Sequence, residues 1–205
     1  MHRDRVLING VEAPSVTQVL GIVRKEFLEK WRGKLGNKEC DRIMHESQEI
    51  GHRIHDAIEC YFRGEEIPEL PQVEAKMFAL FKGWALKTRF TPIELELTLE
   101  NKQYGYHGAT DAIGTFGADE QIWIWDWKTS SKVDDLYGAQ LAAYAAAYSE
   151  LTGKFVNAGG IVRLDKKKEG VIEVKEFPDL KPYFEIFLHA LELYNFTKKK
   201  GKWAK

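Results

Sequence analysis

The sequence contains little cysteine and no marked excess of charge of either sign. Only two of its 205 residues are cysteines, Cys40 and Cys60, too few to hold an iron–sulfur cluster or a four-cysteine zinc site. Two free thiols are typical of a reducing, intracellular compartment. The formal net charge is -1, so no overall positive field indicates a nucleic-acid partner. A local groove can still be positive where acidic groups elsewhere lower the total.

The sequence also lacks a long apolar run. No stretch is long and apolar enough to cross a membrane, and the N-terminus has no apolar signal region. We therefore expect a cytoplasmic protein without a membrane partner. The chain is long enough for one compact domain with its own hydrophobic core.

The spacing of apolar residues changes from helical to strand-like near residue 90. Before that point, the pattern predicts helices over residues 15–32, 40–63 and 71–88. After it, the pattern predicts three strands, a helix, two strands and a last helix, over residues 92–100, 109–116, 121–128, 134–151, 155–164, 171–177 and 180–197.

This order of elements indicates an α/β fold with a mixed central sheet that is flanked by helices. We expect residues 1–205 to form a single domain. Within it, residues 1–90 would form an N-terminal helical layer, and residues 91–205 the sheet core and the C-terminal helix.

The strand predicted at 121–128 carries two charged residues at its end. Because side chains alternate along a strand, Asp126 and Lys128 share a face with two isoleucines, and three tryptophans occupy the other face. Both faces are largely apolar, so the strand is expected to be covered on both sides. An acid and a lysine are costly to bury there unless they are paired or bound to a ligand. A structural Asp–Lys ion pair is one reading of this stretch.

Asp111, in the stretch "GATDAI", adds a second acid. If residues 109–116 and 121–128 form a hairpin, the carboxylates of Asp111 and Asp126 can converge. Two carboxylates hold hard cations such as Mg²⁺ or Mn²⁺, and a nearby lysine can offset developing negative charge. These are the parts of a metal-dependent phosphodiesterase site. Taken alone, Asp111 is better read as an acid in a turn or at a strand end.

Four short motifs together resemble a known family. "GHRIH", "GATDAI", "IWDWKTS" and "QLAAY" follow one another in the order seen in the PD-(D/E)XK nucleases, specifically the RecB-like exonuclease branch. "APSVTQVL" near the N-terminus is similar to the group that includes the mitochondrial genome-maintenance exonuclease and its phage relatives. The resemblance covers most of the chain up to about residue 150, and it implies a restriction-endonuclease-like fold.

The resemblance also implies roles for individual residues. Asp111 and Asp126 would be metal ligands, with the carbonyl of Trp127 as a further oxygen and His55 as a ligand that favours manganese alongside magnesium. Lys128 would be the catalytic lysine. The remaining matched residues, which would bind DNA or support the site, are Glu96, Gln140 and Tyr144.

Several of these residues have simpler readings. His55 could be an ordinary histidine on a helix surface, and Glu96 could be a solvent-facing acid. Tyr144 could pack in a core. Ser15 and Thr17 are better read as helix-capping residues than as DNA contacts.

Together these features predict a metal-dependent DNA exonuclease that uses Mg²⁺ or Mn²⁺ and no iron–sulfur cluster. Its partner would be DNA, single-stranded or with free ends, in recombination, replication or repair, for example in a phage. The alternatives are a structure-specific or nicking endonuclease, and a non-catalytic DNA-binding accessory module. Basic residues that could line a DNA path are Arg24, Lys25, Lys30, Arg32, Lys34 and those of the tail, 198–205.

Overall fold

The computed structural model describes residues 5–23, 26–166 and 170–200 and is built around one five-stranded mixed sheet. Its strands follow the order β3 (Phe90–Asn101), β4 (Tyr106–Phe116), β5 (Asp119–Lys128), β6 (Ala158–Leu164) and β7 (Ile172–Phe177). All neighbours are antiparallel except β5 and β6, which are parallel. A small separate hairpin joins β1 (Leu7–Ile8) to β2 (Val11–Glu12). The α/β class with a mixed sheet flanked by helices is confirmed.

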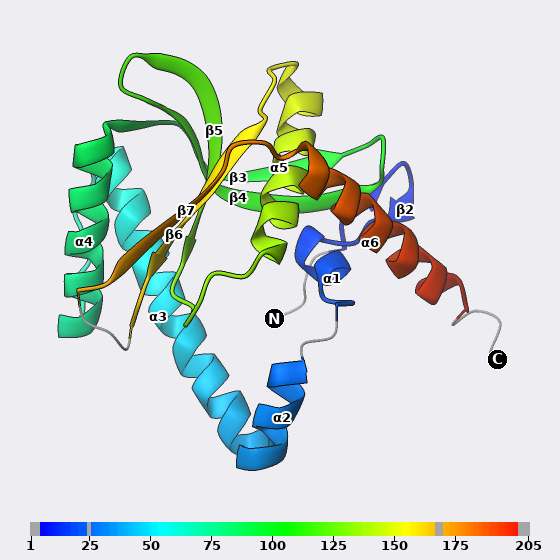
Figure 1. Cartoon of the computed structure of the whole chain (residues 1–205), viewed down its shortest axis with the longest axis horizontal. Helices are drawn as coiled ribbons and strands as arrows, with labels where there is room; N and C mark the ends of the chain where they lie inside the picture. The colour runs from blue at the N-terminus through cyan, green and yellow to red at the C-terminus, as the bar shows by residue number, and fades with distance from the viewer. Residues whose placement is uncertain (1–4, 24–25, 167–169, 201–205) are drawn as a thin grey trace.

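Helix α5 (Leu136–Thr152) connects the two parallel strands. A parallel pair requires such a crossover, because the chain must return to the edge from which it started. The alanine-rich sequence of α5 has high helix propensity and lets the helix lie close to the sheet. This places the residues after β5 and the first turns of α5 at the same end of the sheet (Figure 1).

Each face of the sheet has its own core. On one face, Ile124 packs with α5, with α6 (Lys181–Lys200) and with α1 (Val16–Leu20). On the other face, Trp125 and Trp127 pack with α3 (Asn37–Arg63) and α4 (Gln72–Thr88). The alternation predicted along β5 is therefore confirmed. The helices that precede residue 90 are divided between the two faces (Figure 1).

The single helix expected over residues 15–32 is wrong, because the structure has two shorter helices there. Ser15 caps the start of α1 as predicted, and together with Gln18 it forms a capping box. The helix ends at Gly21, where two short i→i+3 backbone bonds tighten the chain. Buried Val19 and Leu20 anchor this short helix, and glycine is a poor helix former. The chain resumes as α2 (Glu26–Leu35).

Helix α2 and the first half of α3 project from the body as an open V (Figure 1). Gly36 separates them and has a φ of 78°, a left-handed conformation that glycine adopts without strain. Helix α3 then runs back toward the sheet. Among the described residues, none of the helices combines the length and apolar character needed to cross a membrane.

We predict that Gly160→Ala lowers the free energy of unfolding by about 1–3 kcal/mol. An added Cβ at Gly160 would lie 2.3 Å from the ring of Trp125, which is fully buried on the neighbouring strand. Urea denaturation measures the change. The matched control is Gly83→Ala, in the exposed face of α4, where the new methyl group meets nothing within 4 Å. That change should stabilise the protein by about 0.4–1 kcal/mol, and an equal effect of the two substitutions would contradict the packing described here.

Candidate active site

Pairing of β4 with β5 brings Asp111 and Asp126 together. The register pairs Ala112 with Trp125, so one residue further along the ladder Asp111 stands opposite Asp126. The backbone N–H of Trp127 donates a 2.6 Å hydrogen bond to Oδ2 of Asp111. Asp111 is 9% exposed and Asp126 is 2% exposed, so two acids share a largely dehydrated site.

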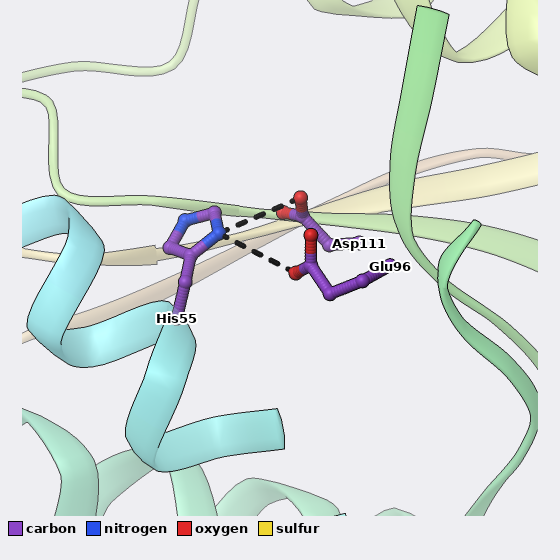
Figure 2. A group of neighbouring side chains, drawn as sticks. All are labelled: His55, Glu96 and Asp111. Atoms are coloured by element: carbon purple, nitrogen blue, oxygen red, sulfur yellow. Dashed lines mark ion pairs between the residues drawn. The ribbon is translucent and has the colours of Figure 1, made fainter. Parts of the chain in front are cut away.

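His55 reaches the same place from α3, on the opposite side of the strand end. Its Nε2 lies 3.1 Å from the carbonyl oxygen of Trp127, and its Nδ1 lies 3.5 Å from Oδ1 of Asp111. Figure 2 shows the imidazole facing the carboxylates of Asp111 and Glu96. His55 is thus half-buried within the acidic cluster and is not a free surface histidine.

Glu96 occupies a strained position in the middle of β3. Its φ is 50°, a left-handed conformation that is uncommon for residues other than glycine, asparagine and aspartate. Such conformations cost of order 1–3 kcal/mol and cluster at functional sites. Its Oε1 lies 3.9 Å from Nδ1 of His55. Burial raises the pKa of Glu96, and the charge of His55 opposes that shift. Glu96 is exposed, but its carboxylate faces His55, so its role at the edge of the site stays a prediction.

The donor set fits a hard divalent cation. One ligand atom each from His55, Glu96 and Asp111 lie within 4.8 Å of one another. Carboxylate oxygens suit Mg²⁺ and Mn²⁺, and imidazole nitrogen is well suited to a transition metal. Burial, together with the charge of Asp126, raises the pKa of Asp111 to about 7. A bound cation would relieve this unfavourable proximity of two acids.

Lys128, at the end of β5, lies beside the acidic residues of the site. Its Nζ forms an ion pair with Oδ2 of Asp126, so the structural pair considered from the sequence is present. Burial lowers the pKa of Lys128, but the carboxylates of Asp126 and Asp111 outweigh it and raise the pKa above its ordinary value. The side chain is therefore an ammonium ion. Because Asp111 and His55 converge beside this pair, it is not an isolated structural contact.

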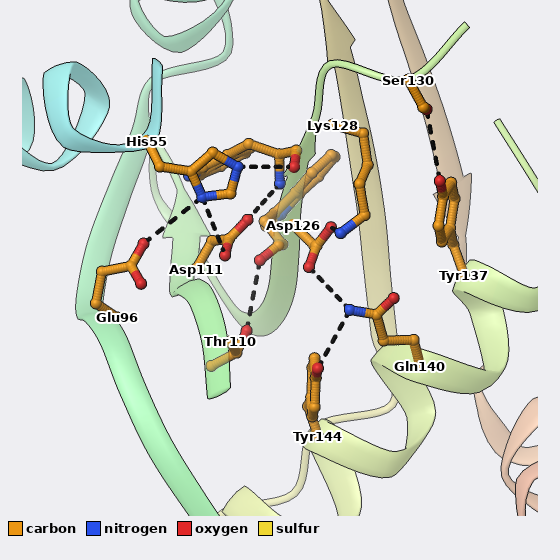
Figure 3. A network of polar contacts seen from close by, with 12 residues as sticks. His55, Glu96, Thr110, Asp111, Asp126, Lys128, Ser130, Tyr137, Gln140 and Tyr144 are labelled. Carbon is orange, nitrogen blue, oxygen red and sulfur yellow. Dashed lines mark hydrogen bonds and ion pairs between the residues drawn. The ribbon is translucent and has the colours of Figure 1, made fainter. Parts of the chain in front are cut away.

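Gln140 and Tyr144 approach Asp126 from α5. Nε2 of Gln140 donates to Oδ1 of Asp126 and to the hydroxyl of Tyr144, each at 3.2 Å (Figure 3). Both residues are buried, and an added Cβ at Gly108 would lie 2.4 Å from the Tyr144 ring. Through these two hydrogen bonds, Gln140 contacts both Asp126 and Tyr144, and the site-supporting role of Gln140 and Tyr144 stays a prediction.

Two further residues near the site have contacts that the sequence motifs do not predict. Tyr137 places its ring 5.2 Å from the Nζ of Lys128. Helical spacing could have indicated this position from the sequence, because Tyr137 precedes Gln140 by three residues and so lies on the same helix face. Arg163, buried on β6 in register with Lys128, donates to the carbonyls of Ser130 and Ser131. The sequence feature that could have indicated this contact with the loop after Lys128 is an arginine within the otherwise apolar stretch "GGIVRL".

The basic residues suggested for a DNA path are only partly described. Arg24, Lys25 and residues 201–205 lie outside the described residues. Arg32 donates a 2.9 Å hydrogen bond to Asp41 across the V of α2 and α3, so its charge is partly neutralised within the protein.

Comparison with known proteins gives one family match. The model of a family described as "PD-(D/E)XK nuclease superfamily" matches residues 70–195, more than half of the chain. This range contains β3 to β7 and α5, and thus all the site residues except His55. A search of curated proteins found no match.

Solved structures that resemble the chain are distant in sequence. A "Putative exonuclease" from Eubacterium rectale is 16% identical, with a TM-score of 0.48, and the alignment covers 72% of this chain and 64% of that one. The chain therefore spans less than two thirds of that protein's length. An alkaline exonuclease from Laribacter hongkongensis is 13% identical, with a TM-score of 0.37, and the alignment covers 76% of this chain and 86% of that one.

We predict that Asp111→Asn stabilises the metal-free protein above pH 7 and that the gain shrinks as the pH falls toward 4. The folded-state pKa of Asp111, about 7, lies above the value of about 3.9 for an unfolded aspartate. The wild-type protein is therefore most stable at a pH below the pKa of Asp111 in the unfolded chain. Its stability falls as the pH rises through the pKa of Asp111 in the folded protein. Asparagine has no such titration and can still accept the Trp127 N–H.

Thermal melts in a chelator across this pH range measure the difference between variant and wild type. Glu120→Gln, which removes an exposed carboxylate from the neighbouring strand β5, controls for the loss of one charge. If the difference in melting temperature between Asp111→Asn and wild type does not change with pH, the proximity of Asp126 and the burial of Asp111 do not raise the pKa of Asp111.

Proposed function

The chain belongs to the PD-(D/E)XK nuclease superfamily, and from that premise we propose that it is a Mg²⁺- or Mn²⁺-dependent deoxyribonuclease of the RecB-like exonuclease type. It would hydrolyse phosphodiester bonds by attack of water, without a covalent enzyme intermediate. The observation that carries the proposal is the convergence of Asp111, Asp126 and Lys128 at one end of the sheet.

Four groups of this chain are suited to hold the ion. They are the carboxylates of Asp111 and Asp126, the imidazole of His55 and the carbonyl oxygen of Trp127. Glu96 lies near enough to add a further oxygen or to orient His55. When bound, a divalent ion there supplies Lewis acidity toward the phosphate and favours deprotonation of the attacking water.

The surrounding side chains keep these groups in place. Gln140 holds one oxygen of Asp126, so the direction of that carboxylate is fixed. The ammonium group of Lys128 lies beside Asp126, where it can donate to the scissile phosphate and offset the negative charge that develops there. His55 contacts both Asp111 and the Trp127 carbonyl, so α3 is tied to the ligands carried by the sheet.

The proposed substrate is DNA, single-stranded or with free ends, and the proposed setting is recombination, replication or repair. Two observations support this. Residues 13–20 and 51–55 carry the N-terminal motifs that resemble the exonuclease group. Helix α3, which carries His55, leads from the open V to the sheet (Figure 1). A strand that reaches the metal ligands would pass this helix.

We predict that Lys128→Ala lowers the rate of DNA cleavage by about 10²–10³-fold, because one preorganised charge that stabilises the transition state is lost. The assay follows a labelled linear single strand with Mg²⁺ or Mn²⁺. Lys154→Ala, which removes an exposed lysine after the C-terminal end of α5, is the matched control and should keep full activity. Undiminished cleavage by Lys128→Ala would remove the proposed mechanism.

A circular single strand tests the requirement for ends. An obligate exonuclease leaves the circle intact while it degrades the linear strand of the same sequence. Cleavage of the circle at a comparable rate would make the protein an endonuclease on the same scaffold, and the exonuclease assignment would be withdrawn.

A further inference from the structure

Asp126 is the anionic partner of Lys128, and it is also a proposed metal ligand. One of its oxygens accepts from Gln140, and the other pairs with the Lys128 ammonium. A cation that draws on the negative charge of Asp126 weakens the hold of this carboxylate on the lysine. Lysine has a flexible four-carbon stem, so its ammonium then needs a second contact to stay in place.

Tyr137 is that second contact. The Nζ of Lys128 lies 5.2 Å from the centroid of the Tyr137 ring, within the range of a cation–π interaction. The ring is neutral and offers its π face, so it attracts an ammonium ion without competing for the metal. The Tyr137 hydroxyl lies 3.5 Å from Oγ of Ser130, in the loop that follows Lys128.

The position of Tyr137 on α5 links it to the other supports of the site. Tyr137, Gln140 and Tyr144 follow one another at spacings of three and four residues, so they share one face of the helix. Figure 3 shows Gln140 directed at Asp126, Tyr144 directed at Gln140, and Tyr137 directed at Ser130 in the loop after β5. One helix face thus supplies a ring to Lys128, an amide to Asp126 and a hydroxyl to that amide.

We propose that Tyr137 is a positioning residue, whose ring holds the Lys128 ammonium in place when a divalent ion occupies the site. The inference rests on the proposed nuclease function for its kinetic consequence, but the contact itself can be observed without any activity. A purely structural role is the competing explanation, because Tyr137 also packs against the core beneath α5.

The kinetic test compares two substitutions in the full chain. Tyr137→Phe keeps the ring and should retain most of kcat on a linear single strand with Mg²⁺. Tyr137→Leu removes the ring and should lower kcat about tenfold, with KM and the calorimetric affinity for Mg²⁺ unchanged. An equal loss in both variants, or a loss that appears in KM or in Mg²⁺ affinity, would overturn the proposal.

The matched control is Tyr194→Leu. Tyr194 makes the same kind of contact, with the Nζ of Lys198 lying 5.4 Å from its ring centroid, and it also packs against the core. It lies on α6, outside the site. Tyr194→Leu should leave kcat unchanged, and a tenfold loss there would mean that kcat responds to general loosening of the core.

The NMR test does not depend on activity. In the Mg²⁺-loaded protein, the ε-methylene protons of Lys128 should show an upfield ring-current shift, assigned by its loss in Lys128→Met. The shift should persist in Tyr137→Phe and disappear in Tyr137→Leu. If Mg²⁺ abolishes it in the wild type, the positioning role is refuted. If the shift behaves as expected while the wild type cleaves no DNA, the nuclease proposal fails and the contact stands.

Discussion

Two buried carboxylates held side by side are the constraint on which the rest of this site depends. Asp111 and Asp126 lie on adjacent strands, and desolvation together with their mutual repulsion makes it costly for both to be ionised. The fold does not separate them. It surrounds them with groups that tolerate or offset negative charge: the Trp127 N–H, the amide of Gln140, the ammonium of Lys128 and the imidazole of His55. A divalent cation bound between these groups would offset the charge of the two acids further.

The two cores of the sheet explain how this site is held rigidly. Trp125 and Trp127 anchor β5 against α3 and α4, while Ile124 anchors it against α5. The alternation of one strand thus fixes the direction of Asp126 and Lys128. Helix α5 contributes Gln140 because the parallel crossover returns it over the end of β5. Helix α3 contributes His55 from the other side, so the site lies where both layers meet the strand ends.

Local sequence patterns predicted the parts of the fold that depend on local physics. The alternation of β5, the capping box at Ser15 and the hairpin that joins Asp111 to Asp126 all follow from spacing and turn chemistry. The break after Leu20 was missed because tertiary burial anchors a helix of five residues that propensity alone would extend. The left-handed Glu96 has no local signal at all, since its strain is held by its surroundings. Arg163 and Tyr137 were missed because their partners come from distant or looped segments.

In the mechanism we propose, one divalent ion is shared by Asp111 and Asp126. Anomalous diffraction at the manganese edge, from crystals of the chain grown with Mn²⁺, tests it most directly. We expect a peak in contact with both carboxylates, with the His55 imidazole and the Trp127 carbonyl beside it. Crystals that show manganese bound elsewhere, or no manganese between these two acids while they keep their present separation, would contradict it.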